Sequence, residues 1–516
     1  MTPAQIRQNI VRSTLSSYLR IAVRMALGLV TFRLLFQSLS PEQFGFWSLL
    51  WAFFGYGILL DFGFGQAAQK RVAELSVRQD WLELSRVLST ILAAYAVSAA
   101  VAVLLGLAFA DTLVGFFQIS PGNRESFQQV LQVFLVGLGL AFPLGLFPDI
   151  LQGQQRITTA NAVALMSNLG NFCAVVSFVV FKLSFLTLVV LTLLCVLIPY
   201  LVAAGIALRR MPAVRLSPWL VSWSTLAETT RFSVYAYLSL LGNVLRTKAD
   251  QPILGAILGA ASVTPYQAGG KIGEMFGMLT RQLAEVLAPT AAHLHAHGDN
   301  PALRRMLVEG LRFSILAATP LYILTAAYLD GLIRLITGDP HPAPAVLWTG
   351  QILLLWNYGL TVTHWVFKKM YLMAGQERRM MWQGIAEAAA NVSLAVSLTL
   401  AFRSIVAVAL AALLPAVVFG WGLLWRWTAR EAGVGRFDLA RVVLLPAWFA
   451  SLPMIVTVAA LRLQPWWASG TTTPRMLTES SFAAIAGIAG VWYLGLFPAE
   501  RHRIAARLRR QPIHLS

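Results

Sequence analysis

Residues 184–208 read SFLTLVVLTLLCVLIPYLVAAGIAL and contain no charged side chain. A helix needs about 20 mostly apolar residues to cross the hydrocarbon core of a bilayer. This stretch is long enough, and basic residues stand beyond both of its ends, at Lys182 and at Arg209. We therefore predict a membrane-spanning helix here.

The composition extends this prediction to the whole chain of 516 residues. Only 12% of the residues are charged and 57% are hydrophobic, whereas soluble domains have about 25% charged and about 45–50% apolar residues. These proportions exclude a disordered chain and a soluble enzyme. The two cysteines, Cys173 and Cys195, lie in apolar runs, which excludes a disulfide scaffold and a cysteine metal cluster.

The predicted fold class is an all-α polytopic membrane protein with about 14 transmembrane helices, counted by the length that a spanning helix needs. No separate soluble domain interrupts the apolar runs. The expected spans are 15–37, 43–63, 87–110, 128–150, 158–181, 184–208, 230–258, 263–288, 309–336, 345–372, 380–402, 405–427, 441–463 and 479–497.

Lysine and arginine are distributed unevenly over the connections. Alternate connections are rich in them, while the opposite set holds only Arg124, Lys182, Arg403 and Arg475. Because basic residues gather on the cytoplasmic side, we expect both termini to be cytoplasmic. The net charge of +18 then reflects topology and contact with anionic lipids, and no nucleic acid partner is expected. The inner connections 66–86 and 209–229 are expected to form short amphipathic surface helices.

A weak internal repeat relates two parts of the chain. Ser16-Ser17-Tyr18 opens the first span and Ser233-Val234-Tyr235 opens the seventh, and repeats with a site at their interface are typical of transporters. We therefore expect four parts, which are an N-lobe of six helices at 1–208, a C-lobe of six helices at 209–428, two further helices at 429–498 and a basic cytoplasmic tail at 499–516.

Eleven charged residues fall inside four of the expected spans, where a lone charge costs about 2.5–3.5 kcal/mol at the bilayer centre. They are Arg20, Arg24, Arg33, Asp61, Arg246, Lys248, Asp250, Lys271, Glu274, Arg281 and Glu285. Such residues must face one another or a water-filled cavity. The four spans are equivalent in the two halves, so we expect them to surround a central cavity. Polar positions from Gln267 to Glu285 recur every three or four residues, which predicts one polar helix face.

Seven of these residues are cations and four are anions, so the expected cavity favours an anion such as phosphate or pyrophosphate. Two alternatives remain open. Arg246 with Asp250, and Lys271 with Glu274, stand at helical spacing and can brace the helices as internal pairs. Arg20 lies near the inner boundary, where its side chain can extend to the interface.

Several segments resemble one protein family in their order and spacing. They are Leu39-Ser40-Pro41-Glu42-Gln43-Phe44-Gly45, Leu60-Asp61-Phe62-Gly63-Phe64-Gly65, Asp250-Gln251-Pro252-Ile253-Leu254-Gly255 and Ala374-Gly375-Gln376. Over nearly its whole length the chain resembles the polysaccharide transporters, which are the O-antigen and exopolysaccharide flippases of the multidrug/oligosaccharidyl-lipid/polysaccharide flippase superfamily. It departs from the family at Gln251-Pro252, where an apolar residue usually follows the aspartate.

The resemblance implies two six-helix lobes around a V-shaped central cavity, with two extra helices. It also implies the substrate, an undecaprenyl-pyrophosphate-linked oligosaccharide that is turned from the inner to the outer leaflet of the bacterial cytoplasmic membrane. We expect alternating access and no cofactor, with coupling to a proton, a sodium ion or the membrane potential. Anionic membrane lipids and other glycan-assembly proteins are the further partners considered.

In this interpretation the cations hold the pyrophosphate. Arg24, Arg246, Lys248 and Lys271 would bind it, and Arg20, Arg33 and Arg281 would form a ladder towards it. The acids Asp61, Asp250, Glu274 and Glu285 would tune the charge or couple transport to the ion. We predict no catalytic residue and no metal site.

Three other functions remain open. A drug/cation antiporter of the same superfamily would need an acidic cavity, which the excess of cations disfavours. A membrane-embedded glycan polymerase or ligase usually builds its catalytic site in a large outer loop, and the outer connections are short. A scaffold for glycan assembly without transport of its own is the third.

The orientation can be tested with single cysteines in a background that lacks Cys173 and Cys195. A cysteine at Ser120 or Thr472 should react with an impermeant thiol reagent from outside the cell. A cysteine at Ser76 or Ser217 should react only after the membrane is permeabilised. Labelling of the Ser76 position in intact cells would contradict the predicted orientation.

Overall fold

The computed structural model describes residues 3–57, 63–463 and 473–502. These residues form α-helices joined by short turns, 3-10 turns and π-helical segments, and this described part of the chain contains no strand. The all-helical fold class is therefore confirmed.

The chain divides into two compact units. Unit 1 comprises Met1–Pro265 and Thr399–Arg403, and unit 2 comprises Tyr266–Leu398 and Ser404–Ser516. The lobes expected at 1–208 and 209–428 were defined by an internal repeat, whereas these two units are defined by their internal contacts. The lobes therefore stay a prediction.

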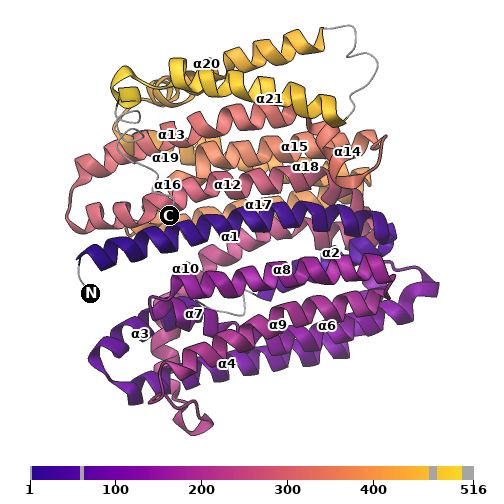
Figure 1. The fold of residues 1–516 in the computed structure, drawn as a ribbon, viewed down its shortest axis with the longest axis vertical. Coiled ribbons are helices and arrows are strands. Elements are labelled where there is room, and N and C mark those ends of the chain that lie inside the picture. Colours follow the sequence, from indigo (N-terminus) through magenta and orange to yellow (C-terminus); the bar gives the residue numbers. More distant parts are fainter. Residues whose placement is uncertain (1–2, 58–62, 464–472, 503–516) are drawn as a thin grey trace, which may run out of the picture. The chain divides into compact units, whose positions relative to one another are not determined.

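In unit 1, long helices lie side by side (Figure 1). α6 packs against α4 and α9, and α8 packs against α1 and α9. Apolar side chains of α3, α4, α7, α8 and α9 form one buried cluster. The helices are α1 Pro3–Ser38, α2 Pro41–Tyr56, α3 Phe64–Arg78, α4 Trp81–Ala108, α5 Ala110–Phe116, α6 Arg124–Leu144, α7 Leu146–Gly153, α8 Ile157–Phe181, α9 Phe185–Arg209, α10 Trp223–Lys248 and α11 Asp250–Leu258, with 3-10 turns η2 Pro121–Asn123, η3 Pro218–Leu220 and η4 Ala260–Ser262.

In unit 2, α20 packs against α13 and α21, and α15 packs against α18. A buried cluster of apolar side chains joins α13, α16, α19 and α20. The helices are α12 Val263–Ala296, α13 Asn300–Ala327, α14 Leu329–Thr337, α15 Pro344–Leu360, α16 Val366–Met373, α17 Glu377–Phe402, α18 Ile405–Val417, α19 Trp425–Ala432, α20 Arg436–Arg462 and α21 Thr473–Gly490, with π-helical segments η5 Thr361–Trp365, η6 Val418–Leu424 and η8 Val491–Gly495.

Within the described residues, ten helical stretches are long and apolar enough to cross a membrane. Each overlaps an expected span, although Asn300–Ala327 begins and ends nine residues before the expected 309–336, whose last part is the separate helix α14. The four expected spans outside this set are 43–63, 230–258, 263–288 and 345–372. The described residues of these four spans are mostly helical. In 230–258 the helix is divided into α10 and α11, and in 345–372 a π-helical segment follows α15. The helix of 263–288, α12, carries several charges. The total of fourteen stays a prediction.

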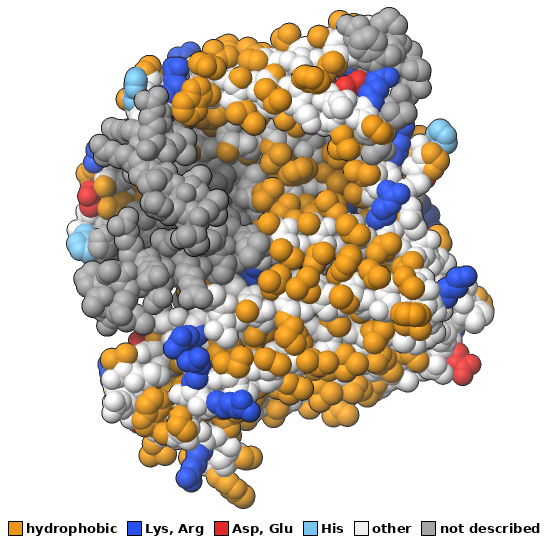
Figure 2. Space-filling view, in the orientation of Figure 1, with side chains coloured by type: hydrophobic (Ala, Val, Ile, Leu, Met, Phe, Trp, Pro, Cys, Tyr) orange, Lys and Arg blue, Asp and Glu red, His pale blue; other side chains and the backbone are white. Residues whose placement is uncertain are grey.

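These helices expose apolar side chains. On α4 and α6, Val97, Leu104 and Leu140 are 64%, 67% and 58% exposed. Figure 2 shows hydrophobic side chains over the sides of the helices on the visible face, with Lys and Arg side chains near helix ends. Because soluble monomers rarely expose such large apolar areas, this surface fits a lipid environment.

A stripe of glycines brings α12 close to α15. If Gly269 carried a Cβ atom, that atom would lie 2.7 Å from the backbone oxygen of Val346. The Cβ positions of Gly273 and Gly277 lie 3.2 and 2.5 Å from the side-chain amide of Asn357. Small residues at every fourth position allow membrane helices to approach backbone to backbone. The stripe therefore sets the face of α12 that packs against α15.

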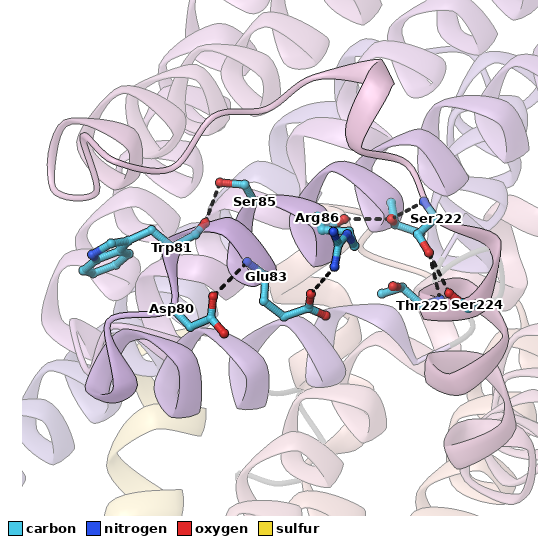
Figure 3. Close-up of polar contacts among 9 residues, drawn as sticks. Asp80, Trp81, Glu83, Ser85, Arg86, Ser222, Ser224 and Thr225 are labelled. Atoms are coloured by element: carbon cyan, nitrogen blue, oxygen red, sulfur yellow. Dashed lines mark hydrogen bonds and ion pairs between the residues drawn. The ribbon is translucent and has the colours of Figure 1, made fainter.

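The segment between α9 and α10 is bound to α4 by its backbone. The N–H groups of Arg215, Ser217 and Ser222 donate to the hydroxyls of Ser85, Ser89 and Thr90 at 3.0, 3.0 and 3.1 Å. Figure 3 shows the polar contacts at the start of α4 and around Ser222. The expectation of an amphipathic helix at 209–229 is therefore wrong over residues 210–222, because side chains of α4 satisfy N–H groups that a helix would use internally.

We expect Gly269→Ala and Gly277→Ala to destabilise the protein by about 1–3 kcal/mol each, because the added methyl overpacks a closed contact. Gly205→Ala on α9 is the matched control, since its Cβ position has no atom within 4 Å. The measurement is the melting temperature of the purified full-length variants. A Gly269→Ala protein that melts like the control would contradict the close approach of α12 and α15.

Candidate functional site

The seventh expected span is two helices in the structure. α10 ends at Lys248, and α11 begins at Asp250 after the single intervening residue Ala249. Pro252 accounts for the break, because proline has no N–H to donate to the carbonyl of Lys248 four residues earlier. The junction gathers three predicted site residues, Arg246, Lys248 and Asp250.

Two of the charges at this junction are buried. Arg246 is 2% exposed and Asp250 is 5% exposed, while Lys248 is half-buried. The Nη2 group of Arg246 donates to Oδ1 of Asn243 at 3.0 Å, one turn earlier on α10. This bond orients the guanidinium. An ion pair between Arg246 and Asp250 stays a prediction.

The three arginines of α1 differ in exposure. Arg20 and Arg33 are half-buried, whereas Arg24 is exposed. All three lie in the apolar stretch Arg20–Ser38. Among the residues that the structure describes, Arg24 has no hydrogen bond or ion pair.

The predicted polar face of α12 is confirmed. Gln267, Lys271, Glu274, Met278 and Gln282 are half-buried and Glu285 is exposed, whereas the intervening Ala268, Ile272, Met275 and Thr280 are buried. Nζ of Lys271 lies 3.1 Å from Oε2 of Glu274, so these two residues form an ion pair on this face.

Two further charges of α12 contact residues that the sequence analysis did not weigh. The guanidinium of Arg281 lies over the ring of Trp365 in η5, 4.5 Å from its centroid. Nζ of Lys369 in α16 lies 2.5 Å from Oε2 of Glu285. These contacts bind α12 to η5 and α16, and in the second of them Lys369 and Glu285 neutralise each other.

The sequence analysis also missed a buried pair, His364 of η5 and Glu387 of α17. Both side chains are wholly buried, with Nε2 of His364 3.1 and 3.2 Å from the two carboxylate oxygens. The signal was present, since His364 lies inside the expected span 345–372 and Glu387 inside 380–402. Both were overlooked because those spans read as apolar.

The predicted site residues fall in both units. Arg20, Arg24, Arg33, Arg246, Lys248 and Asp250 belong to unit 1, and Lys271, Glu274, Arg281 and Glu285 belong to unit 2. Asp61 lies outside the described residues. A single cavity lined by all of them stays a prediction. Among the described residues, no group of three or more His, Cys, Asp or Glu side chains could hold a metal ion.

More than half of the sequence matches a known family. A profile described as "Polysaccharide biosynthesis protein" matches residues 34–342. The chain belongs to this family. It is also 19% identical over 336 residues to a Shigella flexneri protein described as "Putative O-antigen transporter", and the match covers 64% of this chain and 78% of that one. The resemblance to polysaccharide transporters is confirmed.

Solved structures share the fold. The structure of the lipid II flippase MurJ in an inward closed conformation aligns with a TM-score of 0.70 at 12% identity, over 97% of this chain and 100% of that one. An inward-facing multidrug resistance MATE family transporter aligns with a TM-score of 0.66 at 15% identity, over 84% of this chain and 99% of that one. Identities this low show the fold alone.

A third neighbour comes from Pyrococcus furiosus and belongs to the MOP superfamily. It aligns with a TM-score of 0.59 at 16% identity, over 82% of this chain and 95% of that one. The relatives named here are described as transporters or flippases.

The break between α10 and α11 can be tested with Pro252→Ala. The new N–H can donate to the carbonyl of Lys248, so we expect the free energy of local opening to rise by about 1–3 kcal/mol. Amide hydrogen exchange of peptides that cover residues 246–256 measures this change. Gln251→Ala is the matched control, because it adds no N–H, and equal exchange in both variants would refute proline as the cause.

Proposed function

We propose that this chain is a flippase that moves an undecaprenyl-pyrophosphate-linked oligosaccharide across the bacterial cytoplasmic membrane by alternating access. Membership of a polysaccharide biosynthesis family supports the glycan part of the proposal. The relative described as a putative O-antigen transporter and the fold shared with a lipid II flippase support the transport part. The oligosaccharide would be an O-antigen, exopolysaccharide or capsule repeat unit.

The observation that carries the proposal is the exposed guanidinium of Arg24 within an apolar stretch of α1. A charge that faced lipid at this depth would cost about 2.5–3.5 kcal/mol. Arg24 therefore needs water or an anion. A cation about 6 Å from a charge of −2 gains about 5 kcal/mol at an effective dielectric constant near 20, before desolvation is counted, so two or three such contacts could hold a pyrophosphate.

The other cations act together with Arg24 in this proposal. Arg246, held by Asn243, presents a fixed charge at the α10–α11 junction. Lys248 and Lys271 add to the anion site, and Arg20, Arg33 and Arg281 form the ladder. Lys271 is paired with Glu274 in the described conformation, so it would exchange this partner for the pyrophosphate when the substrate binds.

The acids would reset the site after release. Asp250 lies at the same junction as Arg246, and Glu274 lies beside Lys271. Once the pyrophosphate has left, these carboxylates can again neutralise the cations. Asp61, Asp250, Glu274 and Glu285 remain the proposed charge-tuning or coupling residues. Both termini would be cytoplasmic, and anionic lipids and other glycan-assembly proteins would be partners.

A drug/cation antiporter is the second candidate, because MATE transporters share the fold. For the Pyrococcus furiosus transporter, the reverse polarity of its binding pocket is described as suggesting a different function. Polarity can therefore separate functions on this fold. The predicted set of seven cations and four anions favours an anionic substrate over a cationic drug.

The first test is charge reversal at Arg24. In a strain that lacks its own flippase, Arg24→Glu should lower surface glycan about tenfold or more, the factor that about 1.4 kcal/mol of binding free energy produces. Arg24→Lys should keep part of the activity, because charge survives although the planar fork is lost. Arg78→Glu, at the exposed end of α3, is the matched control. Full export with Arg24→Glu at normal abundance would remove Arg24 from the site.

A second test asks whether Arg246 and Asp250 at the α10–α11 junction bind the substrate or only stabilise the helices. Each single variant, Arg246→Gln or Asp250→Asn, leaves one buried charge without its opposite and should lower abundance by destabilising the protein by about 3–5 kcal/mol. The double variant should recover abundance but not glycan export, because the pyrophosphate has lost a contact. Immunoblots and surface glycan in one strain measure both. Recovery of export in the double variant would assign the two residues to structure.

A further inference from the structure

The buried pair of His364 and Glu387 has two possible hydrogen-bonding arrangements, and in each of them both ring nitrogens of His364 have a partner. Nδ1 of His364 lies 2.7 Å from Oγ1 of Thr363, and the same Oγ1 lies 2.8 Å from the backbone oxygen of Gly359. Nε2 faces both oxygens of Glu387. When Glu387 is ionised, its oxygens only accept, so Nε2 then carries a proton in either arrangement.

The Thr363 hydroxyl can serve both protonation states of the ring. If Nδ1 is bare, the hydroxyl donates to it. If Nδ1 carries a proton, it donates to Oγ1, and the hydroxyl proton turns to the carbonyl of Gly359. In neither state does the ring leave a buried nitrogen without a partner, which would be costly.

The surrounding backbone is unusual. His364 and Thr363 lie in the π-helical segment η5, and the π-helical segment η6 packs against them. A Cβ atom at Gly420 of η6 would lie 2.6 Å from Oγ1 of Thr363 and 3.0 Å from Cε1 of His364. Single π-helical turns within α-helices occur frequently at functional sites. Here two of them meet at one titratable side chain.

The neighbouring elements bring few other charges to the pair. Nε2 of Gln383 donates to Oε2 of Glu387 at 2.7 Å, and the buried Oε1 of Gln383 has no partner among the described residues. On α16, Nζ of Lys368 lies 3.7 Å from the Cβ position of Gly384, one turn before Glu387.

α12 also packs against η5 and brings a cation near the pair, because the guanidinium of Arg281 lies over the ring of Trp365, the residue that follows His364. α15 and η6 contain no acidic or basic residue. The buried Arg312 of α13 donates to both carboxylate oxygens of Glu500, and Lys369 of α16 is paired with Glu285. Lys368 is thus the basic side chain placed nearest to Glu387 by these contacts.

We propose that His364, Thr363 and Glu387 form a proton-binding site inside unit 2, and that its proton is the coupling ion of transport. The coupling part rests on the proposed function. In the loading step, a hydronium ion that reaches the ring in another conformation gives one proton to Nδ1 of the neutral imidazole and leaves as water. Glu387 stays ionised, and the Thr363 hydroxyl turns its proton from Nδ1 towards the carbonyl of Gly359. Only the Nδ1–H bond forms, and release reverses the step.

Complete burial gives this site the property that coupling needs. Both side chains are 0% exposed, so a proton cannot exchange with solvent in the described conformation. Loading and release then require another conformation, which ties the proton to alternating access. By contrast, Glu274 and Glu285 are partly exposed and paired with lysines.

The proton itself is tested by nitrogen NMR of the full-length protein in lipid nanodiscs, with isotope-labelled histidine. The chain has seven histidines, and His364→Gln assigns the signal. If that variant does not accumulate, replacing the other six histidines leaves the His364 signal alone. We expect a reversible change between the one-proton and two-proton forms as the pH is lowered. A ring that keeps one form wherever the protein stays folded would overturn the proposal.

Thr363→Val tests the hydroxyl with little change of shape. It removes the group that accepts from Nδ1–H, so the pH at which the ring changes form should shift, while abundance stays near normal. An unchanged titration in Thr363→Val would also overturn the proposal, because the two hydrogen-bonding arrangements depend on this hydroxyl.

Coupling is tested in cells with the double variant His364→Gln/Glu387→Gln. We expect near-normal abundance, loss of most glycan export, and no further loss when an ionophore collapses the pH gradient. Arg475→Gln/Glu479→Gln is the matched control, since it removes a different ion pair of unit 2, one that is only partly buried. Export that equals wild type and still responds to the ionophore would assign the pair to structure. Wild-type protein that exports no glycan would refute the proposed function, while the NMR titration would still decide the proton site.

Discussion

A charge among apolar helices must be neutralised or hydrated, because a lone charge at the bilayer centre costs about 2.5–3.5 kcal/mol. Unit 2 meets this requirement in several ways. Lys271 pairs along its own helix, Arg281 stacks on Trp365, and Glu285 reaches Lys369 on another helix. The contacts of Arg281 and Glu285, which lower the energetic cost of these charges, also hold α12 against η5 and α16. A transport cycle that separates these elements must therefore supply each charge with a new partner, and a charged substrate is one such partner.

Helical periodicity was sufficient to predict a large part of this organisation. The apolar runs predicted all ten stretches that meet the criterion for spanning a membrane. The three-to-four spacing along the eighth span predicted the polar face of α12, and the structure confirms it. Both features are local, since they depend on residues that lie within one helix and share its 3.6-residue repeat.

The remaining site features depend on partners that are distant in sequence. Nothing near Glu285 indicates that Lys369 will contact it, and nothing near His364 indicates Glu387. The π-helical segments change the face on which each following side chain lies, so a regular repeat places these residues wrongly. The segment 210–222 failed for a related reason, because its backbone bonds to hydroxyls of α4 that stand far earlier in the chain.

The contact between Gly277 and Asn357 also constrains the order in which the sequence can change. A side chain at position 277 would meet the Asn357 amide at 2.5 Å, whereas shortening Asn357 first would open that space. Of the two mutational orders that lead to a larger residue at 277, one passes through a clash and the other through a small cavity. Because both overpacking and cavities destabilise a packed interior, the two positions are expected to change as a pair in descendants of this chain.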